Sequence, residues 1–423
     1  MKAVIINHSD SRGGASVVSM RLMKALADKN VDISMLTVHK AGADPAVVTA
    51  APGWRAKLPF LAEHARIFAA NGFTRRDLFA ASIATDGLPL SHHPLVREAD
   101  AVLLNWVNQG MLSLAEIARI AEAGKKIIWT MHDMWNATGI CHHAGTCTRF
   151  TLTPGCGNCP LLHGAASDAD LSRSTWLRKK VLYDCTNIRF VAVSSWLAEK
   201  CRESSLLSRK DVTVIPNAFP VDEFYTAPRR SRAEIGLPEG KKLIVMGAAR
   251  LDDPVKGLPL AIEALNRLAD SSETDAHAVF FGAVRNPDAL AGLRLSHTVL
   301  GPVSDSSILR EIYAHATAVL SSSLYETLPG TLIEGQAAGA YPVSFGNGGQ
   351  RDIIDSPANG YIARSYDTAD LAAGLVRALD GDFDPAWLRD SVSRRFSASA
   401  VADRYLSLLG AMGEVRGTAM VSS

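Results

Sequence analysis

Two carboxylates eight residues apart are the clearest chemical feature of this sequence. Glu326 lies in a loop after an apolar run typical of a buried strand, and Glu334 lies in the first turns of a helix that Pro329 is well suited to open. A carboxylate near a helix N-terminus is favoured by the helix dipole, which alone could explain either residue. Because the pair stands where a strand turns into a helix, hydrogen bonding to the hydroxyls of a sugar and a ribose explains it better.

Two glycines mark a second candidate site near the start of the chain. Gly13 and Gly14 lie between a first apolar run, Lys2 to His8, and an amphipathic helical pattern. Glycines at such a turn let backbone N–H groups approach an anionic ligand at the helix N-terminus. They could equally serve only the turn, since they do not form the GxGxxG pattern of dinucleotide-binding proteins.

Four cysteines within nineteen residues form a third candidate site. The last two are spaced Cys-x(2)-Cys, and the full set is Cys141, Cys147, Cys156 and Cys159. Four thiolates can hold one structural zinc ion in a tetrahedral site, and His142 or His143 could substitute as a ligand. A loop without metal, or two labile disulfides, would explain the spacing too, because it is not that of a standard zinc finger. The sequence thus predicts a candidate structural zinc site and leaves these alternatives open.

The rest of the chain indicates the scaffold that must position these residues. Its 423 residues exceed what one hydrophobic core usually organises, so two domains are expected. Short apolar runs alternate with helical patterns in both halves, which indicates an α/β fold with two parallel, Rossmann-like sheets. The predicted domains are residues 1–218 and 219–396, and a last helix at 397–413 could pack back on the first domain. Ligands of such sheets bind beyond the carboxyl ends of the strands.

Composition excludes several classes of protein. A formal charge of +1 gives no overall attraction to nucleic acid, and no apolar run is long enough to span a membrane. The N-terminus does not resemble a secretory signal, so a cytoplasmic location with reduced thiols is expected. Two mixed basic and apolar segments, 73–79 and 176–182, could contact an anionic membrane at its inner face, or could be solvated helix faces with one buried side.

Taken together, the motifs resemble glycosyltransferase family 4, whose members have the GT-B fold of two Rossmann-like domains facing a cleft. Glu326-x(7)-Glu334, followed by Gly339 and Pro342-Val343, matches the family's glutamate motif. Gly247-x(2)-Arg250 with Lys256-Gly257, Val214-Ile-Pro-Asn217 and Thr130-Met-His132-Asp133 match its other segments in the expected order. The resemblance covers nearly the whole chain.

The resemblance implies a role for each matching residue. In such an enzyme Arg250 and Lys256 hold the donor diphosphate, with Gly13 and Gly14 closing over it, and Glu334 binds the ribose. Glu326, with Gly330 and Thr331, contacts the donor sugar, while His132 lies near the reacting sugar carbon. Cations and N–H groups can stabilise the departing diphosphate, so no metal is needed for catalysis. Standing alone, Arg250 and Lys256 would be surface cations, and His132 a core histidine.

Two further segments refine the expected enzyme. The cysteine segment is similar to one in bacterial colanic-acid and capsule-type glycosyltransferases, whereas Glu326-Thr-Leu-Pro-Gly330 departs from the family's usual Glu-Gly-Phe-Gly. The donor-sugar pocket is therefore the part of the site about which the resemblance to the family says least. Asn105, Trp106 and Asn108 follow another strand and could bind the acceptor, although a packed tryptophan would look the same.

The expected function is that of a retaining, hexosyltransferase-type glycosyltransferase in bacterial surface polysaccharide biosynthesis. The donor would be a UDP- or GDP-sugar, and the acceptor a saccharide or a lipid-linked saccharide. A sugar-nucleotide epimerase of the same fold and a non-catalytic nucleotide-sugar-binding protein are the alternatives. A dehydrogenase is disfavoured because neither half opens with GxGxxG and a following acidic residue.

Overall fold

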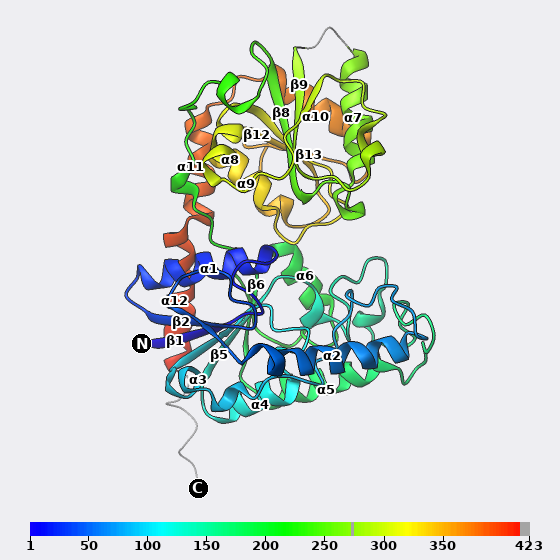
Figure 1. Ribbon diagram of the computed structural model, residues 1–423, viewed down its shortest axis with the longest axis vertical. Helices are drawn as coiled ribbons and strands as arrows, with labels where there is room; N and C mark the ends of the chain where they lie inside the picture. The colour runs from blue at the N-terminus through cyan, green and yellow to red at the C-terminus, as the bar shows by residue number, and fades with distance from the viewer. Residues whose placement is uncertain (272–274, 415–423) are drawn as a thin grey trace. The chain divides into compact units, whose positions relative to one another are not determined.

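The computed structural model describes residues 1–271 and 275–414 and divides them into two compact units (Figure 1). Unit 1 comprises Met1–Ala218 together with the chain from Val401 onward, and unit 2 comprises Phe219–Ala400. Each unit is built on one parallel sheet covered by helices. The predicted fold class, α/β with two Rossmann-like domains, is confirmed.

The sheet of unit 1 has seven strands in the order β3-β2-β1-β4-β5-β6-β7. All neighbours are parallel; Ile5 of β1, for example, is opposite Met35 of β2 on one side and Leu103 of β4 on the other. The chain order reverses between β1 and β4, where open parallel sheets form a ligand crevice. The strands are β1 (Lys2–Ile6), β2 (Asp32–Thr37), β3 (Val47–Thr49), β4 (Ala101–Leu104), β5 (Lys126–Met131), β6 (Arg189–Ala192) and β7 (Val212–Val214).

Seven helices accompany this sheet within the described residues. Between about residues 40 and 95 the sequence pattern is weak and fits either an irregular or a helical segment; the structure places β3, α2 and the first residues of α3 there. The helices are α1 (Gly14–Ala27), α2 (Gly53–Ala70), α3 (Pro94–Glu98), α4 (Leu114–Glu122), α5 (Leu171–Cys185), α6 (Ser195–Glu203) and α12 (Ala398–Glu414).

Helix α12 returns the chain to unit 1 after unit 2 is complete. Its buried Tyr405 hydroxyl hydrogen-bonds to Thr130 of β5 at 2.8 Å. The Lys126 ammonium at the start of β5 donates to the carbonyl oxygen of Leu409 at 3.0 Å. The C-terminal helix therefore covers the middle of the first sheet.

The sheet of unit 2 has six parallel strands in the order β10-β9-β8-β11-β12-β13. The strands are β8 (Lys242–Arg250), β9 (Ala276–Ala283), β10 (His297–Val299), β11 (Ala316–Ser321), β12 (Tyr341–Phe345) and β13 (Tyr361–Ala363). The helices are α7 (Leu258–Ser271), α8 (Ser306–Ala314), α9 (Gly330–Ala337), α10 (Thr368–Asp380) and α11 (Pro385–Phe396).

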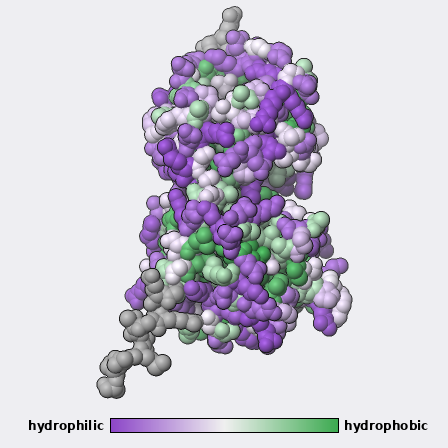
Figure 2. All heavy atoms as spheres, turned by 90° about the vertical axis from the view of Figure 1, so that its left-hand side faces the viewer, coloured by the Kyte–Doolittle hydropathy of each residue, from purple (hydrophilic) through white to green (hydrophobic). Residues whose placement is uncertain are grey.

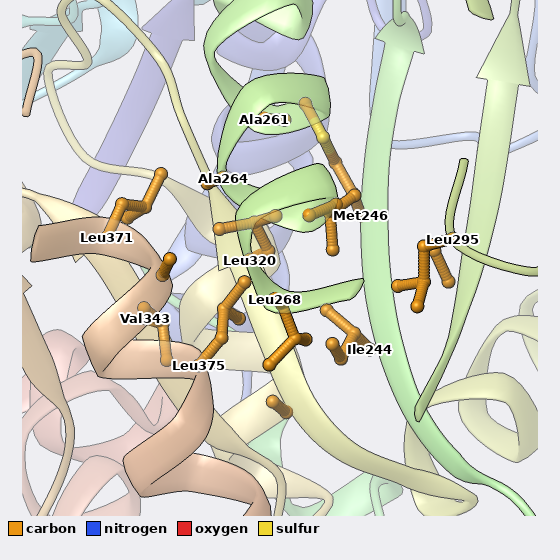
Figure 3. Close-up of a cluster of buried hydrophobic side chains, with 14 of the residues drawn as sticks. Ile244, Met246, Ala261, Ala264, Leu268, Leu295, Leu320, Val343, Leu371 and Leu375 are labelled. Atoms are coloured by element: carbon orange, nitrogen blue, oxygen red, sulfur yellow. The ribbon is translucent and has the colours of Figure 1, made fainter. Parts of the chain in front are cut away.

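The core of unit 2 shows why these segments form strands and helices. Apolar side chains of β8, β11 and β12 meet those of α7 and α10 (Figure 3). Ile244, Leu320 and Val343 are at most 1% exposed, as expected for strands covered by helices on the sheet face. The packing fixes the strands, and thereby the loops at their carboxyl ends.

On the face that Figure 2 shows, hydrophilic side chains cover most of unit 2, whereas hydrophobic side chains gather on part of unit 1. Within the part of the chain that the structure describes, no helix has the length and apolar character needed to cross a bilayer.

Candidate functional site

A cavity of about 150 Å³ opens in unit 2 where β8 and β11 end and α9 begins. Its position matches the place where ligands bind to open parallel sheets. It brings together four of the predicted site residues, Lys256 from one segment of the chain and Glu326, Gly330 and Thr331 from another. Its polar and glycine lining includes Gly247, Lys256, Ser321, Ser323, Glu326, Gly330 and Thr331.

An ion pair between Lys256 and Glu326 dominates the charge of this cavity. The two side chains are 30% and 21% exposed, so a ligand entering the cavity would meet both. The Ser323 hydroxyl donates to Glu326 Oε1 at 3.0 Å, and the backbone carbonyl of Glu326 accepts from the Gly349 N–H at 2.9 Å. These bonds fix the Glu326 loop and leave its carboxylate facing the cation.

The N-terminus of α9 supplies hydrogen-bond donors to the same cavity. Its first residues, Gly330 and Thr331, line the cavity, and no side chain of the described residues caps the helix at Pro329. The first N–H groups of a helix have no partner within the helix, and together with the helix dipole they form a natural anion site. A Cβ on Gly330 would lie 2.9 Å from the Phe219 ring, so a glycine fits this close packing.

Two predicted donor-site residues of unit 2, Arg250 and Glu334, lie outside the lining of this cavity. Arg250, at the end of β8, forms a 2.9 Å ion pair with Asp253 and lies 3.6 Å from Asp252. Glu334 is half-buried one turn into α9, close enough to Tyr313 for its charge to raise further a tyrosine pKa that burial already raises. Their diphosphate and ribose roles therefore stay predictions.

In unit 1, the strand ends carry a cluster of rings around one carboxylate. Asp133, just after β5, accepts from His142 Nδ1 at 2.7 Å and from Trp106 Nε1 at 3.2 Å. Its other oxygen accepts from the Trp135 N–H at 2.8 Å. Burial alone would raise the pKa of Asp133, but the His142 ring and these hydrogen bonds lower it to about 2. The carboxylate is therefore held ionised.

The rings around Asp133 form a continuous surface. Trp106 stacks on His142 with ring centroids 5.7 Å apart and meets His8 edge-on at 5.5 Å. Burial, the nearby His39 and Arg12 lower the pKa of His8 to about 4, so its ring is neutral near pH 7. Aromatic faces and neutral imidazoles suit uncharged, hydroxyl-rich ligands.

His132 lies beside this cluster in a small cavity of about 10 Å³ that Asn105, Thr130 and Tyr405 also line. Burial lowers its pKa to about 4, against the opposing charge of Asp133. Its Nε2 is buried without a hydrogen-bond partner among the described residues. The structure thus makes His132 a neutral imidazole with one free nitrogen.

The other predicted residues of unit 1 differ in how far they are fixed. Asn105 is 3% exposed and its amide donates to Ser19 at 2.6 Å; Asn108 is 5% exposed. Trp106 packs against the His142 ring and also donates a hydrogen bond to Asp133, so the residue is both packed and in polar contact. Gly13 has φ +81° at the start of α1, and a Cβ on Gly13 or Gly14 would meet no atom within 4 Å. The turn is open, and its phosphate contact stays a prediction.

The four cysteines of the predicted zinc site line a single cavity of unit 1, of about 60 Å³, which His143 lines too. None of the four forms a disulfide, and the Gly139 N–H points at Cys156 Sγ over 3.1 Å. Burial raises the pKa of Cys141 to about 12 and that of Cys159 to about 11. Within residues 1–271 and 275–414, however, no three possible metal ligands converge closely enough to hold an ion. The zinc site stays a prediction.

Two residues of this region were missed by sequence reasoning. Lys179 of α5 is fully buried; its ammonium donates to the carbonyls of Trp135 and Thr138 and lies 3.3 Å from the Trp135 ring centroid. Its place in a basic run, next to Arg178 and Lys180, gave it the appearance of a solvated residue. His142 was considered only as a metal ligand, because its partner Asp133 belongs to another motif.

Two parallel sheets covered by helices, with an uncapped helix N-terminus and an ion pair at the carboxyl ends of the second sheet, give the chain a two-domain, Rossmann-like α/β architecture. Comparison with protein families makes this specific. Residues 12–223 match the family described as Glycosyltransferase Family 4, and residues 240–381 match the one described as glycosyl transferases group 1. The first match spans half of the chain, which therefore belongs to glycosyltransferase family 4.

Individual relatives are distant. The chain is 25% identical over 222 residues to a 2-deoxystreptamine glucosyltransferase of Streptomyces kanamyceticus, a match that covers 48% of this chain and 56% of that protein. It is 25% identical over 391 residues to a D-inositol 3-phosphate glycosyltransferase of Nocardia farcinica, covering 88% and 78%. The structure of Anabaena HepE in complex with UDP-glucose has the same fold, with a TM-score of 0.60, 15% identity, and coverage of 97% and 100%.

Proposed function

We propose that this protein transfers a sugar from a nucleotide-sugar donor, a UDP- or GDP-sugar, to the hydroxyl group of a saccharide or lipid-linked saccharide acceptor. The cavity of unit 2 carries this proposal, because it combines the Lys256–Glu326 pair with the uncapped N-terminus of α9. That Anabaena HepE was solved with UDP-glucose supports a uridine nucleotide as the first donor to test.

The charges of the cavity suit the departure of a nucleoside diphosphate. Breaking the bond between sugar and diphosphate concentrates negative charge on the leaving phosphate. Lys256 and the first N–H groups of α9 would stabilise that charge, and Arg250 would add a second cation by exchanging Asp253 for phosphate. In this proposal Glu326 accepts hydrogen bonds from donor-sugar hydroxyls while it orients Lys256. In this proposal the side chains and backbone N–H groups of the protein stabilise the leaving diphosphate, and no part of the step is given to a metal ion.

The cluster of unit 1 suits the acceptor. Trp106 offers a ring face for a sugar, and the His142–Asp133 pair offers a polar group for a hydroxyl. The free Nε2 of the neutral His132 can accept a hydrogen bond from a sugar hydroxyl. Retention of anomeric configuration and a role in bacterial surface polysaccharide synthesis are the finer parts of the proposal, and the resemblance of the motifs supports them.

Binding of nucleotides to the purified chain tests the donor proposal. UDP, GDP and their sugar conjugates are compared by thermal shift and calorimetry, because a ligand at about 100 times its Kd stabilises the native state by about 2.7 kcal/mol. Lys256→Ala should abolish most of the shift. Lys241→Ala, which removes an ion pair with Asp275 elsewhere in unit 2, is the matched control and should bind as the parent does.

The product's anomeric configuration tests the finer claim. With a donor that binds, NMR of the first product should show the configuration of the donor. An inverted product would contradict retention but not transfer. Conversion of the donor to an epimer without any acceptor would instead support a sugar-nucleotide epimerase.

A further inference from the structure

Helix α2 of unit 1 carries an apolar stripe that the fold leaves uncovered. Trp54, Leu58 and Leu61 follow one another at helical spacing and are 64%, 56% and 57% exposed. The opposite side of the helix is buried: Ile67 packs beside Ile83 and Ile140, and Glu63 accepts from the backbone N–H groups of Ile83 and Ala84. The helix is therefore anchored by one side, and its other side presents large hydrophobic residues to solvent.

Two phenylalanines from the segment after α2 extend this stripe. Phe73 and Phe79 are 73% and 61% exposed. Phe73 packs edge-on against Phe68 of α2 with ring centroids 5.7 Å apart, and Phe79 lies 5.0 Å from His64, which in turn packs on Phe60. Both rings thus continue the helix surface. We define the α2 face as the side chains of Trp54, Leu58, Leu61, Phe73 and Phe79.

Positive charge surrounds the α2 face. Residues 52–79 contain five basic residues, Arg55, Lys57, Arg66, Arg75 and Arg76, and two acidic residues, Glu63 and Asp77. Glu63 is fully buried against backbone donors, and Asp77 is already paired with Arg76 and His163. Arg66 is likewise paired with Asp86 outside the segment, so Arg55, Lys57 and Arg75 give the exposed surface its positive charge, although the chain as a whole is nearly neutral.

We propose that the α2 face docks unit 1 on an anionic lipid bilayer. Tryptophan, phenylalanine and leucine with flanking lysine and arginine are the residues with which peripheral helices enter the interface between headgroups and acyl chains. The cations attract anionic headgroups, and the apolar side chains then leave water. A second copy of the chain is a poorer occupant, because a two-fold interface would bring the same cations face to face.

Vesicle sedimentation with the full chain tests this proposal. The protein should bind vesicles of phosphatidylcholine mixed with phosphatidylglycerol, bind pure phosphatidylcholine only weakly, and be released by high salt. Replacing Trp54, Leu58 and Leu61 together by serine should weaken binding at least about tenfold. Arg55→Gln and Lys57→Gln should each weaken it about fivefold on the anionic vesicles.

Trp387→Ser is the matched control for the apolar change. Trp387 lies on α11 of unit 2, is 41% exposed, and has Asp382, Asp384 and Asp390 nearby in the sequence, so it should not contribute to binding. All the replaced side chains are exposed, and unchanged melting temperatures will show that the variants fold. If the triple variant does not fold, the single Trp54→Ser variant tests the same surface.

Three outcomes would overturn the proposal. Equal binding to neutral and anionic vesicles would remove the role of the cations, and unchanged binding of the serine variants would remove the role of the α2 face. A dimer in light scattering that the serine variants convert to monomer would show that a second copy covers the face. Nucleotide binding by unit 2 is independent of all three, so these outcomes leave the donor proposal intact.

Discussion

The carboxyl ends of the strands form a similar edge in both sheets, but the side chains at the two edges differ in chemistry. In unit 2 the edge presents opposite charges and bare N–H groups, with Lys256 and Glu326 partly exposed. In unit 1 the corresponding edge presents Trp106, the neutral imidazoles of His8 and His132, and a strongly hydrogen-bonded carboxylate, Asp133. The difference indicates a division of tasks: the edge of unit 2, which carries a cation, suits a ligand whose negative charge grows during reaction, and the aromatic edge of unit 1 suits a hydroxyl-rich partner.

The largest effect is expected from removing the cation of unit 2. Lys256→Ala should lower kcat about 10²- to 10³-fold, because its charge acts most strongly on the departing diphosphate. Stability should change by no more than about 1 kcal/mol, since the ion pair with Glu326 is partly solvated. Steady-state kinetics and thermal melts measure both. A loss of stability without a loss of kcat would make Lys256 a structural residue.

The next effect concerns nucleotide affinity alone. Glu334→Ala should weaken binding of the nucleoside diphosphate by about 1–3 kcal/mol if its carboxylate accepts hydrogen bonds from ribose hydroxyls. Calorimetry on the folded variant measures this. Unchanged affinity would contradict the ribose assignment while leaving the assignments of Lys256 and Glu326 in place.

A variant in unit 1 should show the opposite pattern. His142→Ala removes one of the three hydrogen bonds to Asp133, and we expect kcat/KM for the acceptor to fall about 10- to 150-fold, because a hydrogen bond to a charged group contributes about 1.5–3 kcal/mol. Nucleotide affinity should not change, because His142 lies in the other unit. If the variant lost nucleotide affinity by as much as it lost kcat/KM for the acceptor, the proposed division of tasks between the two edges would be contradicted.

Acid should destabilise unit 1 more than unit 2. Burial lowers the pKa of His8 and His132 to about 4, and it lowers the pKa of His39 and His93 as well, whereas in unit 2 it lowers that of His277. A histidine whose folded pKa is depressed binds protons more readily when unfolded, so stability is lost as pH falls from about 6.5 toward 4. Differential scanning calorimetry at pH 7 and pH 5 should show the larger shift in the transition of unit 1. His8→Asn should reduce that shift.

The smallest expected effect on catalysis comes from the cysteine cavity. If the four cysteines bind zinc, purified protein should carry about one zinc ion per chain, and Cys156→Ser should lose it. Because the same segment holds His142, the variant should raise the acceptor KM and leave nucleotide affinity unchanged. Metal analysis decides the matter: four titratable thiols without zinc would contradict the site.

Strand positions were the part of the fold most open to prediction. Lys126–Thr130 and Leu243–Gly247 are two of the short apolar runs by which the sequence indicates parallel strands, and β5 and β8 include them, because strands buried on both faces are apolar throughout. Helix α2 lies in the region that the sequence left open between an irregular and a helical segment, because its exposed stripe of Trp54, Leu58 and Leu61 obscures the usual contrast between an apolar inner face and a polar outer face.

The candidate site likewise has some contacts that the sequence predicts and others that only the folded chain creates. Gly330 and Thr331 lie next to Glu326 in the sequence, so a motif could bring them into one cavity with Lys256. The pairing of Asp133 with Trp106 joins residues 27 positions apart, and no local pattern encodes that contact. The buried Lys179 is the strongest example, since its burial depends on carbonyl groups of Trp135 and Thr138 that only the folded loop brings together.

The return of α12 to unit 1 bears on the order in which the protein folds during synthesis. Unit 2 begins and ends at one place, where the Phe219 N–H donates to the carbonyl of Phe396 at 2.9 Å. Unit 1 cannot bury Thr130 against Tyr405 until the last helix leaves the ribosome. We therefore expect the C-terminal unit to finish first, against the usual N-terminal-first order. A nascent chain arrested with residues 1–400 emerged should contain a protease-resistant unit 2 and a protease-sensitive unit 1.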